Sequence, residues 1–295
     1  MERSSKLAVR SHGSDDKHSL KGNNLQPGDR VSMDQYVVAK KGRTLTNTSV
    51  ESQKYNGGTI FTDHASNKIF NYHQVSLPTG ETLIGKRILE RDAHNNGISI
   101  KGFLADNGVF NSREFTEDLA QKHQTIRFSG VGAHHQNGIA ERTIKTISYL
   151  ARTNLIHAAL RWPSMHDLEL WPMAMDHCVY VYNNTPGLDG LSTEEKWTGT
   201  KFNDYSHVRR LHPWGCPSYV LDPKLQDGKK LPKWSPRSRQ GQFVGLSKTH
   251  ASNVALILNP RTKRISPQYH IVFDDFFTMV RSVDDTADPV MTGTD

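Results

Sequence analysis

The sequence has little cysteine and no long apolar run. Its 295 residues include two cysteines, Cys178 and Cys216, and both lie among apolar neighbours. Two isolated thiols argue against a disulfide framework and favour a reducing compartment. No uninterrupted apolar stretch approaches the roughly 18 residues of a membrane span, and residues 1–10 carry mixed charge instead of a secretory signal. We therefore expect no membrane partner, and no zinc site is visible.

Acidic residues are fewer than basic ones, and the excess of positive charge is distributed unevenly along the sequence. The net charge is +7 and the isoelectric point is near 9.3, which favours a polyanionic partner such as nucleic acid. Residues 205–270 hold twelve Lys or Arg and two Asp, whereas residues 274–295 hold six Asp and one Arg. The sequence thus predicts a basic module followed by an acidic tail.

Three carboxylates stand out by their place in predicted elements. An apolar run, residues 98–105, stops at Asp106, where Asn107-Gly108 is a turn signal. Glu141 falls in the first turn of a predicted helix. Asp34 lies midway along an apolar strand, residues 30–38, where an unpaired charge is costly. Carboxylates that converge are suited to Mg²⁺, which prefers oxygen ligands. Asp63 is the alternative first ligand, but it sits beside a hairpin turn, where an Asx turn or an exposed acid is the simpler interpretation.

The predicted helix after residue 138 has one apolar and one polar face. Its apolar stripe comprises Ala140, Ile144, Ile147, Ala151 and Leu155. One position on, Glu141, Lys145, Ser148 and Arg152 repeat the same spacing, so they share a polar face. Lys145 and Arg152 therefore lie on the same face as Glu141, and the pattern by itself is compatible with a solvated basic face.

A series of short motifs extends over residues 28–277. They are Met33-Asp34, Phe61-Thr62-Asp63-His64-Ala65-Ser66, Ala105-Asp106-Asn107-Gly108, Gln136-Asn137-Gly138-Ile139-Ala140-Glu141-Arg142, Tyr182-Asn183-Asn184-Thr185-Pro186, Glu195-Lys196-Trp197-Thr198-Gly199, Trp214-Gly215-Cys216, Pro236-Arg237-Ser238 and Gly241-Gln242-Phe243-Val244-Gly245. In content and order this series resembles the integrase catalytic core of Copia-type long-terminal-repeat retrotransposons, a branch of the retroviral integrase superfamily. That family has about 35 residues between the last two acids of its Asp-Asp-Glu motif, and 34 residues separate Asp106 from Glu141.

The resemblance implies a chemistry, a cofactor and partners. Asp34, Asp106 and Glu141 would be the catalytic residues and would bind two Mg²⁺ or Mn²⁺ ions. The reaction would join 3′-hydroxyl ends of retrotransposon cDNA to target DNA. Double-stranded DNA, from the element's ends and from the target, would be the partner of a homo-oligomer. The protein would act in the nucleus after assembly in the cytoplasm.

The predicted fold is α/β, with a ribonuclease-H-like mixed five-stranded sheet flanked by helices. Three antiparallel strands precede a strand, helix, strand unit, and a helical segment and a small basic β-rich module follow. The predicted parts are a disordered segment 1–27, the catalytic core 28–184, a linker 185–210, the β-rich module 211–277 and an acidic disordered tail 278–295.

Further residues are candidates for binding DNA or for forming a mobile loop that gates the site. Arg142, Lys145 and Arg152 on the helix, with Lys229, Lys230, Lys233, Arg237 and Arg239 in the module, are the candidates for phosphate contacts. The glycine-rich loop before the helix fits a mobile gate, formed by Gly130, Gly132, His134, His135, Gln136, Asn137 and Gly138. The two histidines either touch a phosphate near the metals or are an exposed pair.

Two other functions compete with integration. One is a catalytically silent DNA-binding remnant of a retrotransposon polyprotein, with the same fold and basic module. The other is a ribonuclease-H-type nuclease. The intact triad of acids argues against the remnant, while the Gln136 to Arg142 motif and the basic module argue against the nuclease.

Overall fold

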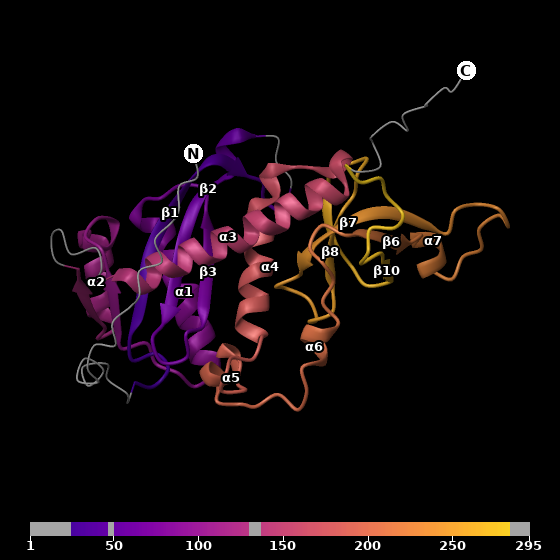
Figure 1. Ribbon diagram of the computed structural model, residues 1–295. Coiled ribbons are helices and arrows are strands. Elements are labelled where there is room, and N and C mark those ends of the chain that lie inside the picture. The colour runs from indigo at the N-terminus through magenta and orange to yellow at the C-terminus, as the bar shows by residue number, and fades with distance from the viewer. Residues whose placement is uncertain (1–24, 47–49, 130–136, 284–295) are drawn as a thin grey trace, which may run out of the picture.

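The computed structural model describes residues 25–46, 50–129 and 137–283, which form two five-stranded sheets with helices around and between them (Figure 1). The first part comprises β1 (Val31–Gly42), β2 (Tyr55–Asp63), β3 (Ile69–Gln74), α1 (Thr79–Asn95), β4 (Gly102–Ala105), α2 (Arg113–Gln121) and β5 (Thr125–Phe128). Next come α3 (Gly138–Arg161), α4 (Trp171–Asn184), α5 (Thr193–Thr198) and α6 (Ser206–Arg209). The second part comprises β6 (Pro217–Leu221), α7 (Pro223–Gln226), β7 (Ser238–Leu246), β8 (Ala255–Leu258), β9 (Ile265–Gln268) and β10 (Ile271–Phe273). Short 3-10 helices are η2 (Glu51–Gln53), η3 (Val109–Asn111), η5 (Pro163–Met165) and η6 (Leu168–Leu170).

The first sheet has the order β3-β2-β1-β4-β5. The first three strands are antiparallel neighbours, whereas β4 is parallel to β1 and β5 is parallel to β4. The predicted mixed, ribonuclease-H-like sheet is therefore confirmed. The strand predicted over residues 98–105 is shorter than expected, since β4 begins only at Gly102.

Alternate residues of β1 and β2 point to opposite faces of this sheet. Met33 and Phe61 are buried in a cluster with Leu83 and Leu89 of α1, whereas Tyr36 and Ile60 are buried with residues of α3 and α4. The sheet is thus covered on both faces, and even-numbered positions of β1 face α3.

The second sheet is wholly antiparallel, in the order β10-β6-β7-β8-β9. Helix α4 contacts both β3 and β7, and one buried cluster joins α3 and α4 to Phe243 and Ile257 of this sheet. The basic module therefore packs directly on the core.

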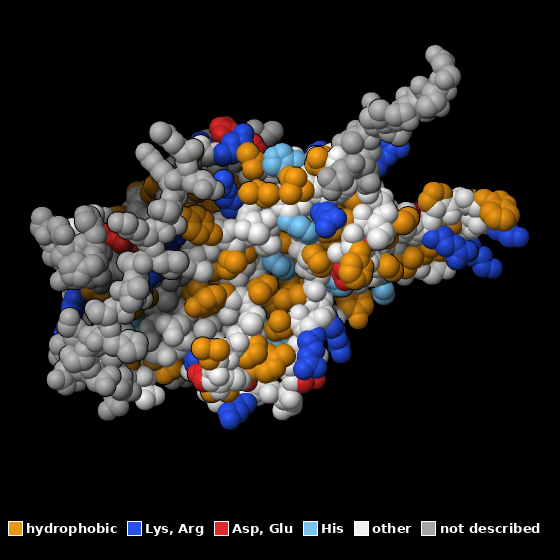
Figure 2. All heavy atoms as spheres, in the orientation of Figure 1, with side chains coloured by type: hydrophobic (Ala, Val, Ile, Leu, Met, Phe, Trp, Pro, Cys, Tyr) orange, Lys and Arg blue, Asp and Glu red, His pale blue; other side chains and the backbone are white. Residues whose placement is uncertain are grey.

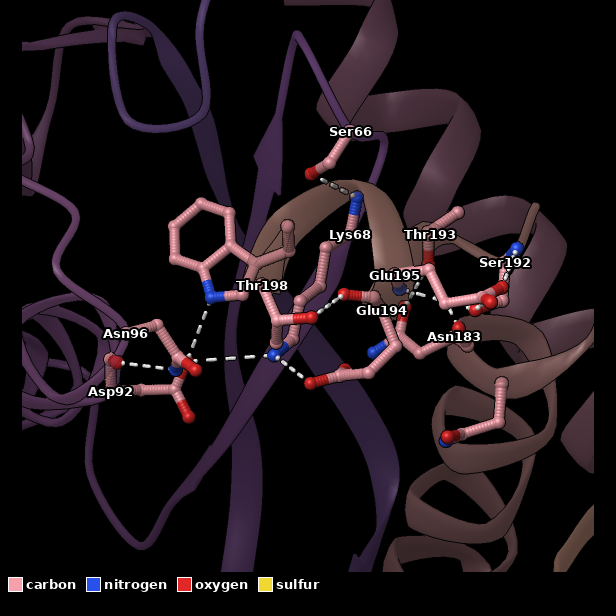
Figure 3. Close-up of polar contacts among 12 residues, drawn as sticks. Ser66, Lys68, Asp92, Asn96, Asn183, Ser192, Thr193, Glu194, Glu195 and Thr198 are labelled. Carbon is pink, nitrogen blue, oxygen red and sulfur yellow. Dashed lines mark hydrogen bonds and ion pairs between the residues drawn. The ribbon is translucent and has the colours of Figure 1, made fainter. Parts of the chain in front are cut away.

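The segment predicted to be a linker, residues 185–210, contains structure that belongs to the core. Helix α5 begins with a capping box, in which Ser192 and Glu195 each accept from the other's backbone N–H. Trp197 is 1% exposed and lies in the cluster of the first sheet, with its Nε1 donating to Asp92 Oδ2 at 3.1 Å. Figure 3 shows Lys68 between Asp92 and Glu194 beside this helix, at 3.4 and 2.9 Å. A linker is therefore the wrong description of residues 193–198.

Two helix starts follow from the residues in their first turns. The N-cap of α2 is Ser112, whose Oγ accepts from Phe115 N. The pair Trp171-Pro172 begins α4, because proline in a first turn sacrifices no helical hydrogen bond.

The predicted terminal segments lie mostly outside the described residues. Residues 1–24 and 284–295 are not described, whereas residues 278–283 are: Val280 packs on the larger cluster and Val283 N donates to Leu160 O at 3.0 Å. Over the described ranges, no helix is both long and apolar enough to cross a membrane.

Candidate active site

Asp34 and Asp106 are brought to neighbouring positions on one face of the first sheet. Strands β1 and β4 are parallel, with Val31 opposite Phe103 and Ser32 opposite Leu104. Continuing this register by two residues sets Asp34 opposite Asp106, just past the end of β4, on strands about 4.8 Å apart. Like Tyr36, Asp34 is on the face that α3 covers.

Helix α3 begins over this same point. Asn137, the residue before the helix, is fully buried and donates from Nδ2 to Met33 O at 3.2 Å. Six residues on, Thr62 Oγ1 of β2 donates to Thr143 Oγ1 at 3.1 Å. These bonds fix the first turns of α3 against β1 and β2, and Glu141 lies between their two attachment points. Half-buried Glu141 is therefore held near Asp34.

The three carboxylates interact electrostatically. Burial, with a smaller contribution from repulsion by Asp106 and Glu141, raises the pKa of Asp34 to about 6, although the hydrogen bond from Gln35 N to Oδ1, 2.8 Å long, opposes the rise. Such a group favours a nearby cation. Even so, no three His, Cys, Asp or Glu side chains of residues 25–46, 50–129 and 137–283 are gathered closely enough to hold an ion as they stand.

Asp106 has a partner that the sequence did not indicate. The hydroxyl of Ser129 donates to Asp106 Oδ1, and Ser129 N donates to Ala105 O at 3.0 Å. Ser129 directly follows β5 as Asp106 directly follows β4, so the parallel pairing of these strands brings the two side chains together. A serine after an apolar strand carries no sequence signal of this contact, because the contact depends on which strands pair.

Asp63, the alternative first ligand, is occupied in the turn after β2. It is fully buried, and its Oδ1 accepts from Gly28 N at 2.9 Å. Its Oδ2 accepts from Ala65 N, Ser66 N and Ser66 Oγ at 3.1, 2.7 and 2.8 Å. The Asx-turn interpretation of Asp63 is thus the correct one, although the side chain is buried.

The candidate DNA-binding cations form two separate groups. Arg142, Lys145 and Arg152 are exposed on α3, on the side that also carries Glu141; Arg142 Nε donates to Gly138 O at 2.7 Å and Lys145 Nζ is 5.8 Å from the centre of the Tyr149 ring. The second group is exposed on the connection between β6 and β7 and at the start of β7, at the end of the molecule away from the first sheet (Figure 1). It comprises Lys229, Lys230, Lys233, Arg237 and Arg239.

The predicted gate lies largely outside the described residues. Gly130, Gly132, His134, His135 and Gln136 are not described. Asn137 and Gly138 are, and both belong to the start of α3. The buried Oδ1 of Asn137 has no hydrogen-bond partner, so this side chain is held by its Nδ2 alone.

Comparisons with known proteins add a sequence relative. No family model matches the chain. Over 181 residues, 58% of its length, the chain is 28% identical to the retrovirus-related Pol polyprotein from transposon TNT 1-94 of Nicotiana tabacum. The match spans 13% of that polyprotein, so the activities of the whole polyprotein are not thereby those of this chain.

Solved integrase structures resemble the chain more distantly. The catalytic core domain of HTLV-2 integrase in complex with magnesium, in a dimeric form, is 18% identical, with a TM-score of 0.43 over 59% of this chain and 98% of that one. The intasome of simian T-cell lymphotropic virus in complex with the PP2A regulatory subunit B56 gamma is 15% identical, with a TM-score of 0.45 over 88% of this chain and 80% of that one. At such scores the fold assignment rests on the sheet order itself. The transposon relative and the ribonuclease-H-like sheet together support an integrase core of the ribonuclease-H-like superfamily.

Proposed function

We propose that this chain is a Copia-type retrotransposon integrase that joins 3′-hydroxyl ends of element cDNA to target DNA in a divalent-metal-dependent reaction. The observation that carries the proposal is the register of β1 and β4, which sets Asp34 beside Asp106, under the helix turn that bears Glu141. Nuclear action, with assembly in the cytoplasm, and a homo-oligomer are part of the proposal, since integration joins two DNA ends to a chromosome.

The residues of the site fit Mg²⁺ or Mn²⁺. Asp34, Asp106 and Glu141 offer hard oxygen donors, and the raised pKa of Asp34 reflects charge that a cation would relieve. A pair of such ions supplies activation of an attacking oxygen and stabilisation of a leaving oxygen at phosphorus. Ser129 restrains one oxygen of Asp106, and Asn137 fixes the height of α3 above β1.

The chain's other contribution is to position DNA. Arg142, Lys145 and Arg152 lie on the polar side of α3 that begins with Glu141, so they can contact phosphates next to the carboxylates. Such contacts are independent of base sequence, which suits an arbitrary target. The cations of the β6–β7 connection are too far along the molecule to share that contact and would bind a separate stretch of DNA.

A strand-transfer assay tests the proposal. The chain is incubated with a labelled duplex end, a target plasmid and Mg²⁺, and joined products are counted. We expect the parent chain to form joined products. Their yield should fall at least a hundredfold in Asp106→Asn and should be unchanged in Glu117→Gln. The control removes an acid of the same charge from the exposed face of α2, where its ion-pair partner among the described residues is Arg113.

The same assay separates the competing functions. Cleavage of an RNA–DNA hybrid without joining would identify a nuclease. DNA binding without either reaction, in a folded chain with Mg²⁺ and Mn²⁺ both tried, would identify a silent remnant.

A further inference from the structure

One tryptophan of this protein is placed unlike the other four. Trp162, Trp171, Trp197 and Trp214 are 6%, 8%, 1% and 3% exposed, whereas Trp234 is 88% exposed. The sequence contains five tryptophans, so these are all of them. An indole left almost wholly in water loses the burial that normally stabilises it, and exposed tryptophans are concentrated at binding surfaces.

Trp234 lies on a projecting arm, which we define as residues 222–239, the connection from β6 to β7 together with the first two residues of β7. Figure 1 shows it extending from the second sheet away from the rest of the molecule. Its base is closed by Asp222 N, which donates to Arg237 O at 2.8 Å, and its tip by Ser235 N, which donates to Pro232 O at 3.0 Å. Pro232 and Pro236 flank the indole and restrict the backbone around it. The tryptophan is therefore presented on a shaped turn.

The arm is also strongly basic. It holds six Lys or Arg and two Asp, and Lys229 is the one cation of the arm with an acidic partner among the described residues, Asp227 at 3.6 Å. Lys233 Nζ lies 5.2 Å from the centre of the Trp234 ring. Figure 2 shows hydrophobic and basic side chains side by side on this projection. The cations without an acidic partner are complementary to an anionic ligand, and the exposed indole is complementary to a flat apolar group.

Nucleic acid with unpaired bases satisfies both requirements in one molecule. Phosphates complement the lysines and arginines, while an exposed base offers a face on which an indole can stack. The bases of an intact duplex are already stacked on each other, so they are closed to such a contact. An acidic protein surface would satisfy the cations but would leave the indole without an aromatic partner.

We propose that the arm binds DNA where its bases are unpaired, with Trp234 stacked on a base and the neighbouring Lys and Arg side chains on flanking phosphates. The inference rests on the proposed function only in taking DNA as the partner. It adds a preference for frayed or single-stranded DNA, at a place distant from the three carboxylates.

Tryptophan fluorescence can test this directly, because Trp234 is the residue open to a soluble quencher. The full chain carrying Asp106→Asn, which removes turnover, is titrated with a short oligonucleotide and with the same strand annealed to its complement. We expect the single strand to quench the exposed emission and to protect it from iodide. The Trp234→Ala chain should lack the iodide-accessible emission, while its four buried tryptophans report that it is folded.

Affinity measurements then separate stacking from charge. Trp234→Ala should weaken single-strand binding about tenfold or more and duplex binding much less, and Trp234→Phe should retain most of the affinity. Lys230→Ala is the matched control: it should weaken both forms alike and lower the salt dependence by about one counterion.

Three results would overturn the proposal. In the first, Trp234→Ala binds single-stranded and duplex DNA as tightly as its parent does. In the second, the substitution weakens binding of the two DNA forms by the same factor. In the third, Trp234→Ala changes the oligomeric state of the DNA-free chain. The last result would assign Trp234 to a contact between copies. Failure of the strand-transfer assay alone would sink the catalytic proposal and leave stacking by Trp234 intact, so the two failures are distinguishable.

Discussion

At the scale of single residues, the charge of Asp34 costs stability until something neutralises it. The pKa of Asp34 is about 6 in the folded chain, against 3.8 for an ordinary aspartate. Between those values the folded state keeps a proton that the unfolded state has lost. The contribution of protonated Asp34 to the free energy of unfolding is therefore fully present below about pH 4 and is lost as the pH rises through about 6.

This linkage gives the first prediction. Asp34→Asn should stabilise the metal-free chain at pH 7 by roughly 1–2 kcal/mol, after allowance for solvent screening, and should give no stabilisation at pH 4. Urea unfolding at both pH values measures the difference. Adding Mg²⁺ should stabilise the parent more than the variant. An Asp34→Asn chain that is less stable than its parent at pH 7 would mean that the carboxylate is satisfied by the protein itself.

Ser129 is the subject of the second prediction. Ser129→Ala removes the hydroxyl that donates to Asp106 Oδ1 and leaves that carboxylate free to rotate. Loss of a group that orients a metal ligand typically lowers metal affinity or activity by about 10–100-fold. We expect the Mg²⁺ concentration for half-maximal joining to rise by about tenfold in Ser129→Ala. Ser252→Ala, at an exposed serine of the turn between β7 and β8, should leave the Mg²⁺ dependence unchanged.

At the scale of elements, segments that bury a patterned face were predictable, whereas helix α5 was not. The alternation of β1 and β2 and the spacing of Ile147 and Ala151 in α3 reflect burial, which leaves a trace in the sequence. Helix α5 has six residues, too few for a periodic pattern, and its place in the core depends on Trp197 reaching Asp92. Ser129 was invisible for a related reason, since its role depends on the pairing of β4 with β5.

Helix α5 supplies the third prediction, which uses two tryptophans. Trp197→Ala removes an indole that is 1% exposed, packs 5.2 Å from the Phe70 ring centre and donates to Asp92. It should lower the free energy of unfolding by about 3–5 kcal/mol. The same substitution at Trp234, which is 88% exposed, should change it by less than about 0.5 kcal/mol. Similar small losses for both would restore the description of residues 193–198 as a linker.

At the scale of the whole molecule, α4 ties the two sheets together. Its Asp176 accepts from His73 of β3 at 3.1 Å and pairs with Lys248, which follows β7, at 2.8 Å. Although burial alone would raise the pKa of Asp176, its neighbours Lys248 and His73 outweigh that effect and lower it. Apolar packing adds to this link, because Met173 and Cys178 of α4 share one cluster with Phe243 and Val244 of β7. Parts joined by a common core unfold together.

The two cysteines allow that cooperativity to be measured. Cys178 is on α4 and Cys216 immediately precedes β6; burial raises the pKa of both thiols, to about 12 for Cys178, so neither reacts readily in the folded chain. In Cys216→Ala and Cys178→Ala chains, which keep one thiol each, the urea midpoint for thiol labelling should equal the midpoint of tryptophan emission in the same chain. Labelling of Cys216 at a lower urea concentration than the emission change would show that the second sheet opens alone. The basic arm would then belong to an independently folding module, and the separation between the arm and the three carboxylates would vary with that opening.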